Sequence, residues 1–143
     1  MSFDLKLFGG DLVIKNGDFE TVEDTDKLVQ DVLKLVSTQI GSNVFFPAYG
    51  SPMSQALIGT AQDPEFAENV ATQQLRSSLE RLQQLQNDQL RSGQNITPEE
   101  QIAGIENVRV SQDRNDPRFY IVNLTVISKA FQRVPISFAV AAV

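Results

Sequence analysis

The chain has 143 residues, a formal net charge of −6, and neither cysteine nor histidine. This length suits one domain, residues 1–143, and the negative charge argues against a protein that binds nucleic acid or an anionic membrane surface. Without cysteine and histidine, the sequence excludes disulfides, thiol nucleophiles, histidine acid–base catalysis and zinc sites with Cys or His ligands.

The first segment with a clear local pattern predicts a β-hairpin. Residues 11–15 and 18–22 are rich in apolar side chains and flank the pair Asn16-Gly17. An Asn-Gly pair between such stretches favours a tight turn, because both turn residues need a positive φ. We therefore expect an N-terminal hairpin.

The next segment predicts an amphipathic helix that begins near Asp24 and stops at Gly41, a residue suited to the left-handed position that closes a helix. Its apolar side chains recur at three- and four-residue steps and indicate a mostly buried face: Leu28, Val29, Val32, Leu33, Leu35, Val36 and Ile40.

An aromatic turn follows this helix. Pro47 and Gly50 turn the chain, and Phe45, Phe46 and Tyr49 supply apolar mass between them. A turn with three aromatic residues in so short a span is expected to dock onto the core.

Two further helical segments are expected before the C-terminal third. Residues 53–58 predict a short helical turn that ends at Gly59, and residues 63–65, Asp-Pro-Glu, predict the start of a long helix that runs to about Leu90 and ends at Gly93. Leu75, Leu79, Leu82 and Leu85 recur at three- and four-residue spacing, and the other face is rich in glutamine. The helix is either a partner-helix or coiled-coil seam, or an ordinary long amphipathic helix with one core stripe. The apolar spacing favours the second interpretation, because it does not hold a heptad.

The C-terminal third predicts a three-stranded antiparallel meander. Residues 97–100 form a capping-box pattern that starts a short helix to about Ala103, and strands are expected at 105–112, 119–128 and 134–143. The middle strand is apolar on both faces, which favours the centre of a sheet. The fold class is thus α+β: an N-terminal hairpin, two main helices with short helical turns, and the meander.

The last strand should lie at an edge, because Pro135 cannot donate to a ladder. One face carries Val134, Ile136, Phe138 and Val140, and no residue of 134–143 is charged. Free edges are usually protected by charge or cover. This edge is therefore either covered within the chain, for instance by the N-terminal hairpin, or paired with a strand from a partner.

The helix exit resembles the signature of the sheath-initiator family, the baseplate wedge proteins of contractile-tailed phages, which are related to a type VI secretion baseplate subunit. The matching residues agree in identity and spacing: Thr38, Gly41, Pro47, Tyr49, Gly50 and Ser51. Ser42 and Asn43 stand where the family has Glu-Arg, Ala48 replaces an Asp, and the family's Glu-Pro-Arg motif has no counterpart.

The resemblance implies a structural protein and not an enzyme, without a cofactor or metal, in the virion at the tail baseplate, assembled in the host cytoplasm. Its implied partners are the tail sheath protein and other wedge and hub-proximal subunits, in a ring of copies within the baseplate rather than a free homo-oligomer. No nucleic acid and no membrane are expected as partners. In the family, the sheet accepts extended sheath arms as added strands. On that basis Val134, Ile136, Phe138 and Val140 are the predicted strand-addition residues.

Two alternatives remain. Members of this family have been labelled lysozyme-like, and a glycan hydrolase would need two carboxylates across a cleft. The candidate acids, Asp63, Glu65, Glu99 and Glu106, all have capping or solvated-face explanations. A soluble binding module or assembly chaperone unrelated to tails is the other alternative, which the glutamine-rich helix permits.

Overall fold

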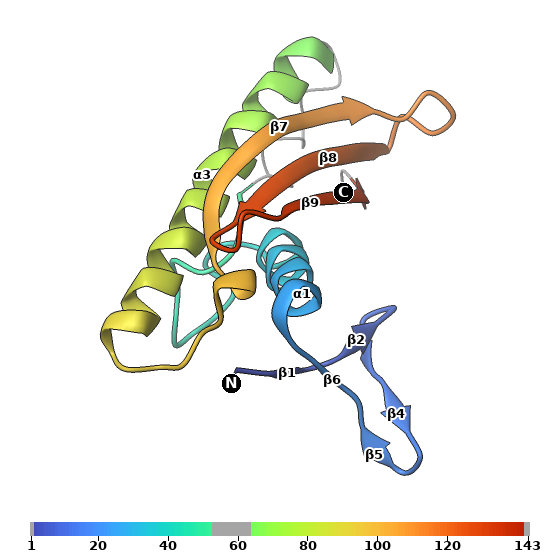
Figure 1. Cartoon of the computed structure of the whole chain (residues 1–143). Coiled ribbons are helices and arrows are strands. Elements are labelled where there is room, and N and C mark those ends of the chain that lie inside the picture. Colours follow the sequence, from blue (N-terminus) through green and yellow to red (C-terminus); the bar gives the residue numbers. More distant parts are fainter. Residues whose placement is uncertain (1, 53–63, 142–143) are drawn as a thin grey trace.

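A computed structural model of the chain describes residues 2–52 and 64–141. It is a mixed α+β fold in which helices α1 and α3 pack on one face of a three-stranded antiparallel sheet (Figure 1). A small N-terminal β-ribbon unit extends away from this body. In the described ranges, no helix is long and apolar enough to cross a bilayer.

The N-terminal unit has three arms, each an antiparallel pair of two-residue strands. The predicted Asn16-Gly17 turn is confirmed, and both of its residues have positive φ. The rest of the predicted hairpin separates, because its outer residues pair with other segments. The arms are β1 (Asp4–Leu5) with β6 (Thr21–Val22), β2 (Leu7–Phe8) with β3 (Asp11–Leu12), and β4 (Ile14–Lys15) with β5 (Asp18–Phe19).

A closed triangle of backbone hydrogen bonds joins the three arms at their centre. The N–H of Lys6 donates to Glu20 O (2.8 Å), Glu20 N–H donates to Val13 O (2.9 Å), and Val13 N–H donates to Lys6 O (3.1 Å). These residues recur every seven positions, and each follows an Asp and a large apolar residue in the sequence. The unit is therefore a short internal repeat folded with pseudo-threefold symmetry.

Helix α1 (Asp24–Ser37) ends earlier than the predicted Gly41. Thr38 has extended backbone angles, and its hydroxyl donates to Lys34 O. Its carbonyl then accepts from Ser51 N–H, so the chain after Ser37 belongs to the following loop. The predicted apolar face is confirmed within the helix, where Leu28 and Val32 are fully buried, while Ile40 lies outside it.

Helix α3 (Pro64–Arg91) confirms the predicted long helix and its end before Gly93. The predicted turn at 53–58 and its end at Gly59 lie outside the described residues, as does Asp63. The described core stripe of α3 packs against the sheet and α1: Ala67, Ala71, Leu75, Leu79 and Leu82.

The short helix after Thr97 is a single turn, η1 (Pro98–Glu100), and not a helix to Ala103. Its capping box is confirmed, because Glu100 Oε2 accepts a hydrogen bond from Thr97 N–H at 3.0 Å. Strand β7 (Ile102–Gln112) accordingly begins at Ile102 rather than Ile105. The N–H of Ile102 bonds to the side chain of Gln86, which fixes the chain in an extended conformation there.

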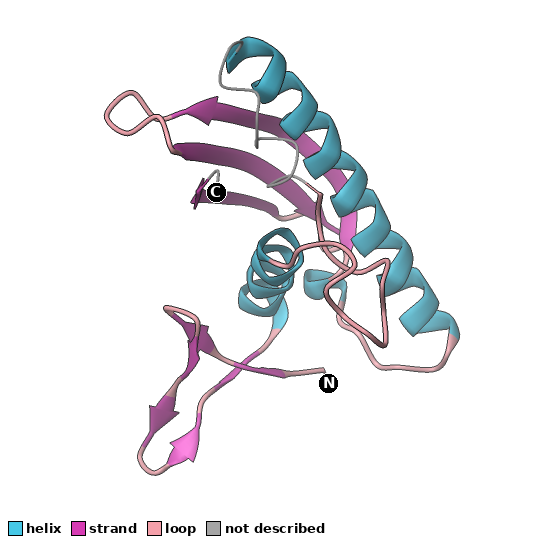
Figure 2. Cartoon of the chain, turned by 180° about the vertical axis from the view of Figure 1, so that it is seen from behind, coloured by secondary structure: helices cyan, strands magenta, loops and turns pink. Residues whose placement is uncertain are grey.

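The sheet order is β7–β8–β9, with β8 (Phe119–Ser128) in the predicted central place and β9 (Arg133–Ala141) at an edge. The two helices lie on the same face of the sheet. Figure 2 shows this arrangement from behind. Tyr120, Val122, Leu124 and Val126 of β8 are buried on that face, while Phe119 on the other face is 38% exposed. The apolar second face of β8 is thus partly open in the described structure.

Candidate interaction surfaces

The signature residues form a closed loop after α1. Ser51 N–H donates to Thr38 O (2.8 Å), and Gly41 N–H donates to Pro47 O (3.0 Å). Gly50 has φ +118° and lies directly against the backbone of residues 38–40. These residues therefore form one structural unit, in which each glycine occupies a position that needs a positive φ.

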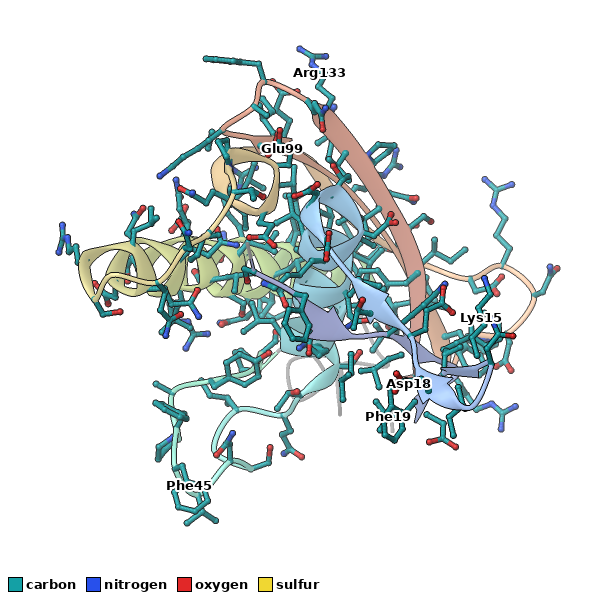
Figure 3. The ribbon with its side chains drawn as sticks, turned by 60° about the horizontal axis from the view of Figure 1, so that its bottom comes forward. Lys15, Asp18, Phe19, Phe45, Glu99 and Arg133 are labelled. Carbon is teal, nitrogen blue, oxygen red and sulfur yellow. The ribbon has the colours of Figure 1, made fainter. Side chains whose placement is uncertain are left out.

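The expectation that this aromatic turn docks onto the core is wrong for two of its three rings. Phe45 is 88% exposed and Phe46 is 67% exposed, and Figure 3 shows Phe45 at the outer end of the loop, pointing away from the body. The side chain of Asn43 accepts hydrogen bonds from both of their N–H groups (3.0 and 3.2 Å), which holds the tip outward. Tyr49 alone packs against the core.

Charged groups surround Tyr49 and connect the N-terminal unit to α1. Lys34 pairs with Asp4 and lies 3.7 Å from Asp31. Burial alone would raise the pKa of Asp4, but hydrogen bonds from Lys34 and Gln30 outweigh it and hold the pKa below 3.8. Burial raises the pKa of Tyr49 above 10.0. This cluster fixes the position of the N-terminal unit relative to α1. Its geometry does not suggest a catalytic site.

A cleft of about 340 Å³ lies between the aromatic turn and α3. The loop contributes Phe45 and Phe46, and α3 contributes Arg81, Leu85 and Asp88. Leu85 is 40% exposed. The cleft therefore joins the exposed rings to an exposed stripe of the helix. The hydrophobicity of the rings predicts that they are buried, so this cleft does not follow from the sequence.

The outer edge of β9 is the second candidate surface. The described N-terminal strands pair among themselves, and β9 is paired only with β8 in the described part of the chain. The proposed cover by the N-terminal hairpin is thus not present in the described structure. The predicted strand-addition side chains all face the core: Val134 and Ile136 are buried, and Phe138 and Val140 are packed against the same cluster.

The hydrogen-bond pattern shows which groups of β9 face outward. Ser128 N–H bonds to Gln132 O, and the register continues without a shift to Ala141. Hydrogen-bonded and non-hydrogen-bonded pairs alternate along an antiparallel ladder. Residues 134, 136, 138 and 140 therefore bond to β8, and the N–H groups of Ser137, Ala139 and Ala141 point to the open edge. Pro135, which has no N–H, occupies an outward position, as this pattern requires.

The opposite edge of the sheet is protected in a way that β9 is not. The N–H of Gln112 in β7 donates to Glu68 Oε1 of α3 (2.8 Å), and Ile102 N–H donates to Gln86 Oε1 (2.8 Å). The register of β7 also shifts twice, and the strand carries the charged residues Glu106 and Arg109. These are the features that block edge-to-edge pairing. Residues 134–141 of β9, in contrast, carry no charged side chain.

The candidate acids of a glycan hydrolase come from separate elements. Glu65 lies in the first turn of α3, Glu99 in η1, and Glu106 in β7, while Asp63 lies outside the described residues. Glu106 faces Arg133 at 3.8 Å, an exposed ion pair between the two edge strands. In the described ranges, no group of three or more acids could hold a metal ion. No pair of these acids lines a common cleft described here.

Comparison with known proteins adds no assignment: no protein-family model and no curated protein matches the chain.

Proposed function

We propose that this protein is a structural assembly subunit whose open sheet edge, β9, accepts an extended strand from a partner. The resemblance of the loop after α1 to the sheath-initiator signature makes that partner the tail sheath protein of a contractile phage. In this proposal the protein belongs to the baseplate wedge, and the first sheath subunits add their arms to its sheet.

The observation that carries the proposal is the contrast between the two edges of one sheet. The β7 edge is capped by α3 side chains, shifted in register and charged along its length. In the described structure, β9 after Arg133 presents unpaired backbone groups and no charged side chain. An added strand gains backbone hydrogen bonds without demanding particular side chains. The contacts would involve the backbone of Ser137, Ala139 and Ala141, while the four core-facing side chains of β9 hold that strand in place.

A binding measurement with one backbone group removed tests the proposal. The probe is a peptide of the sheath's extended arm, titrated into the purified chain by calorimetry. Ala139→Pro removes one outward N–H and leaves the bonds to β8, as Pro135 already does at an equivalent position. We expect binding to weaken about three- to tenfold, the effect of one lost backbone hydrogen bond.

Ala139→Ser is the matched control, because it changes the side chain and retains the N–H. It should bind the peptide as the wild-type chain does. No binding by the wild-type chain, or equal binding by the proline and serine variants, would exclude strand addition at this edge.

A further inference from the structure

The exposed rings of the aromatic turn and the helix beside them form one continuous surface. We name this the loop–helix surface: Val44, Phe45 and Phe46 of the turn, with Arg81, Gln84, Leu85 and Asp88 of α3. Val44 and Phe45 are 87% and 88% exposed. Monomeric soluble proteins rarely expose such groups together, and an apolar patch with a polar rim marks an interaction site.

The surface is rigid, because the turn is held by its own hydrogen bonds. Asn43 Oδ1 accepts from the N–H groups of Phe45 and Phe46, and Tyr49 N–H donates to Phe46 O (2.9 Å). The backbone of α3 is bonded within the helix. An extended strand would therefore find few free backbone groups here, and an occupant must bind through side chains, as a helix does.

The order of charges along α3 indicates which helix fits. Arg81, Gln84, Leu85 and Asp88 are spaced three, four and seven residues from the first, so they share one face. Arg81 and Asp88 lie about 10 Å apart along the axis at 1.5 Å per residue, with Leu85 near the midpoint. Rotation by 180° about that midpoint exchanges a positive end for a negative end. The stripe is therefore complementary to itself in the antiparallel orientation.

We propose that the loop–helix surface joins two copies of this chain in a symmetric dimer, with antiparallel α3 helices and a twofold axis beside Leu85. Arg81 then faces Asp88 of the partner subunit, and symmetry repeats the pair on the other side of the axis. The two leucines meet at the centre. The aromatic turns of both copies cover the pair of helices from its two sides, so that Phe45 and Phe46 become buried.

The two charges are available for such pairs. In the described part of the chain, the carboxylate of Asp88 has a loose contact of 3.9 Å with Arg91, and both side chains are largely exposed. Arg81 donates to the hydroxyl of Ser78 at 3.2 Å and has further N–H groups free to donate. The β9 edge is not part of this surface. The test of the dimer is therefore independent of the test of strand addition.

Sedimentation velocity of the purified full chain, over a range of concentrations at about 0.15 M salt, tests the dimer under conditions where short-range pairs persist. The wild-type chain should shift from monomer to dimer as its concentration rises. Arg81→Asp and Asp88→Arg should each raise the dissociation constant about tenfold, because each places like charges opposite one another at two symmetric positions. The double variant should restore dimerisation, and it retains the wild-type net charge of −6.

A matched pair of phenylalanine substitutions tests the apolar part. Phe45→Glu should abolish the dimer. Phe8→Glu makes the same change at an 81% exposed ring in β2, which lies far from α3 (Figures 1 and 2), and should leave the dimer intact. Circular dichroism confirms that each variant is folded.

A wild-type chain that stays monomeric across the range would overturn the proposal. So would a dimer that the double charge reversal fails to restore, or one that resists Phe45→Glu. A failed rescue by the double variant, or a dimer that persists in Phe45→Glu, would show that the two copies contact each other through another surface.

Discussion

The backbone of Gly50 lies against the carbonyl oxygen of Thr38, so closely that a Cβ atom on Gly50 would be 2.6 Å from that oxygen. The same Cβ would be 2.9 Å from Ile40 N. Both neighbours are backbone atoms and cannot move aside as a side chain would. This contact closes the loop after α1, and it explains physically why a glycine stands at this position.

We therefore predict that Gly50→Ala lowers the free energy of unfolding by about 3 kcal/mol, from a φ of +118° together with the backbone clash. Gly41→Ala is the matched control. Its φ is +85°, but no atom lies within 4 Å of the added Cβ, so it should cost only about 1 kcal/mol. Urea denaturation followed by circular dichroism measures both. Equal losses would mean that the contact with Thr38 does not constrain the loop.

The helices and the meander could be predicted because their apolar spacing is local. The buried stripe of α1 and the inward face of β9 follow directly from residue order, as does the edge position that Pro135 requires. The exposed rings of Phe45 and Phe46 could not be predicted from their hydrophobicity. Their orientation depends on hydrogen bonds within the loop, made by Asn43, and these bonds outweigh the tendency of aromatic rings to be buried.

The burial of two helix glutamines could not be predicted from the sequence either. Gln30 and Gln86 lie on helices whose polar faces predict solvent, yet each is less than a tenth exposed. Their hydrogen-bond partners lie in distant segments and include backbone N–H groups, which no local pattern reveals. The seven-residue repeat of the N-terminal unit was visible as Asp4, Asp11 and Asp18, each before a large apolar residue. The triangle itself cannot be read from the repeat, because its hydrogen bonds join residues that come together only in the folded chain. The sequence predicts a β9 edge that is either covered within the chain or paired with a partner. Which N–H groups of β9 point outward follows only from the strand register.

The side chain of Gln30 attaches the N-terminal unit to α1 through three hydrogen bonds. It accepts from Leu7 N–H (2.9 Å) and donates to Leu5 O (2.8 Å) and to Asp4 Oδ2 (3.0 Å). Gln30→Met retains the length of the side chain and removes these bonds. We predict that the amides of the backbone triangle then exchange at least about tenfold faster, because the unit opens locally while the body stays folded.

Hydrogen exchange measured by mass spectrometry or NMR checks this prediction. Amides in β8 should retain their wild-type rates. Gln83→Met, at an α3 glutamine with one long bond of 3.5 Å, is the matched control and should change neither region. Uniform acceleration across the chain would contradict a local role for Gln30.

The ion pair between Lys34 and Asp4 predicts a dependence of stability on pH. The pKa of Asp4 lies below 3.8 in the folded chain, since the hydrogen bonds from Lys34 and Gln30 outweigh burial. The folded state therefore binds fewer protons than the unfolded state near this pH. The contribution of the ionised carboxylate is present above pH 3.8 and is lost as the pH falls through the lower folded value.

Both side chains are partly exposed, so this contribution is about 0.5–1 kcal/mol. Asp4→Asn should lower stability by that amount at neutral pH and make no difference at the acid limit. Lys34→Met should remove the same pH-dependent component, and the double variant should lose little more. Denaturation curves from neutral pH to below 3.8 measure this. Parallel profiles for the wild-type chain and Asp4→Asn would contradict the assignment.

Gln86 links α3 to the start of the sheet, and its removal should be among the most damaging single changes in the body. Its Nε2 donates to Glu100 O (2.8 Å), its Oε1 accepts from Ile102 N–H (2.8 Å), and the side chain is only 5% exposed. Gln86→Ala leaves a buried backbone donor and a buried acceptor without partners. Each such group costs about 1–3 kcal/mol, so we expect a total loss of about 2–6 kcal/mol.

Gln73→Ala is the matched control, because Gln73 is an exposed glutamine of the same helix. It tests the change in helix propensity alone and should alter stability by less than about 0.5 kcal/mol. Accelerated exchange of the Ile102 amide in Gln86→Ala would place the damage at the first residue of β7. A loss no larger than that of Gln73→Ala would mean that water replaces the glutamine without cost, and that the β7 edge does not depend on α3 for its protection.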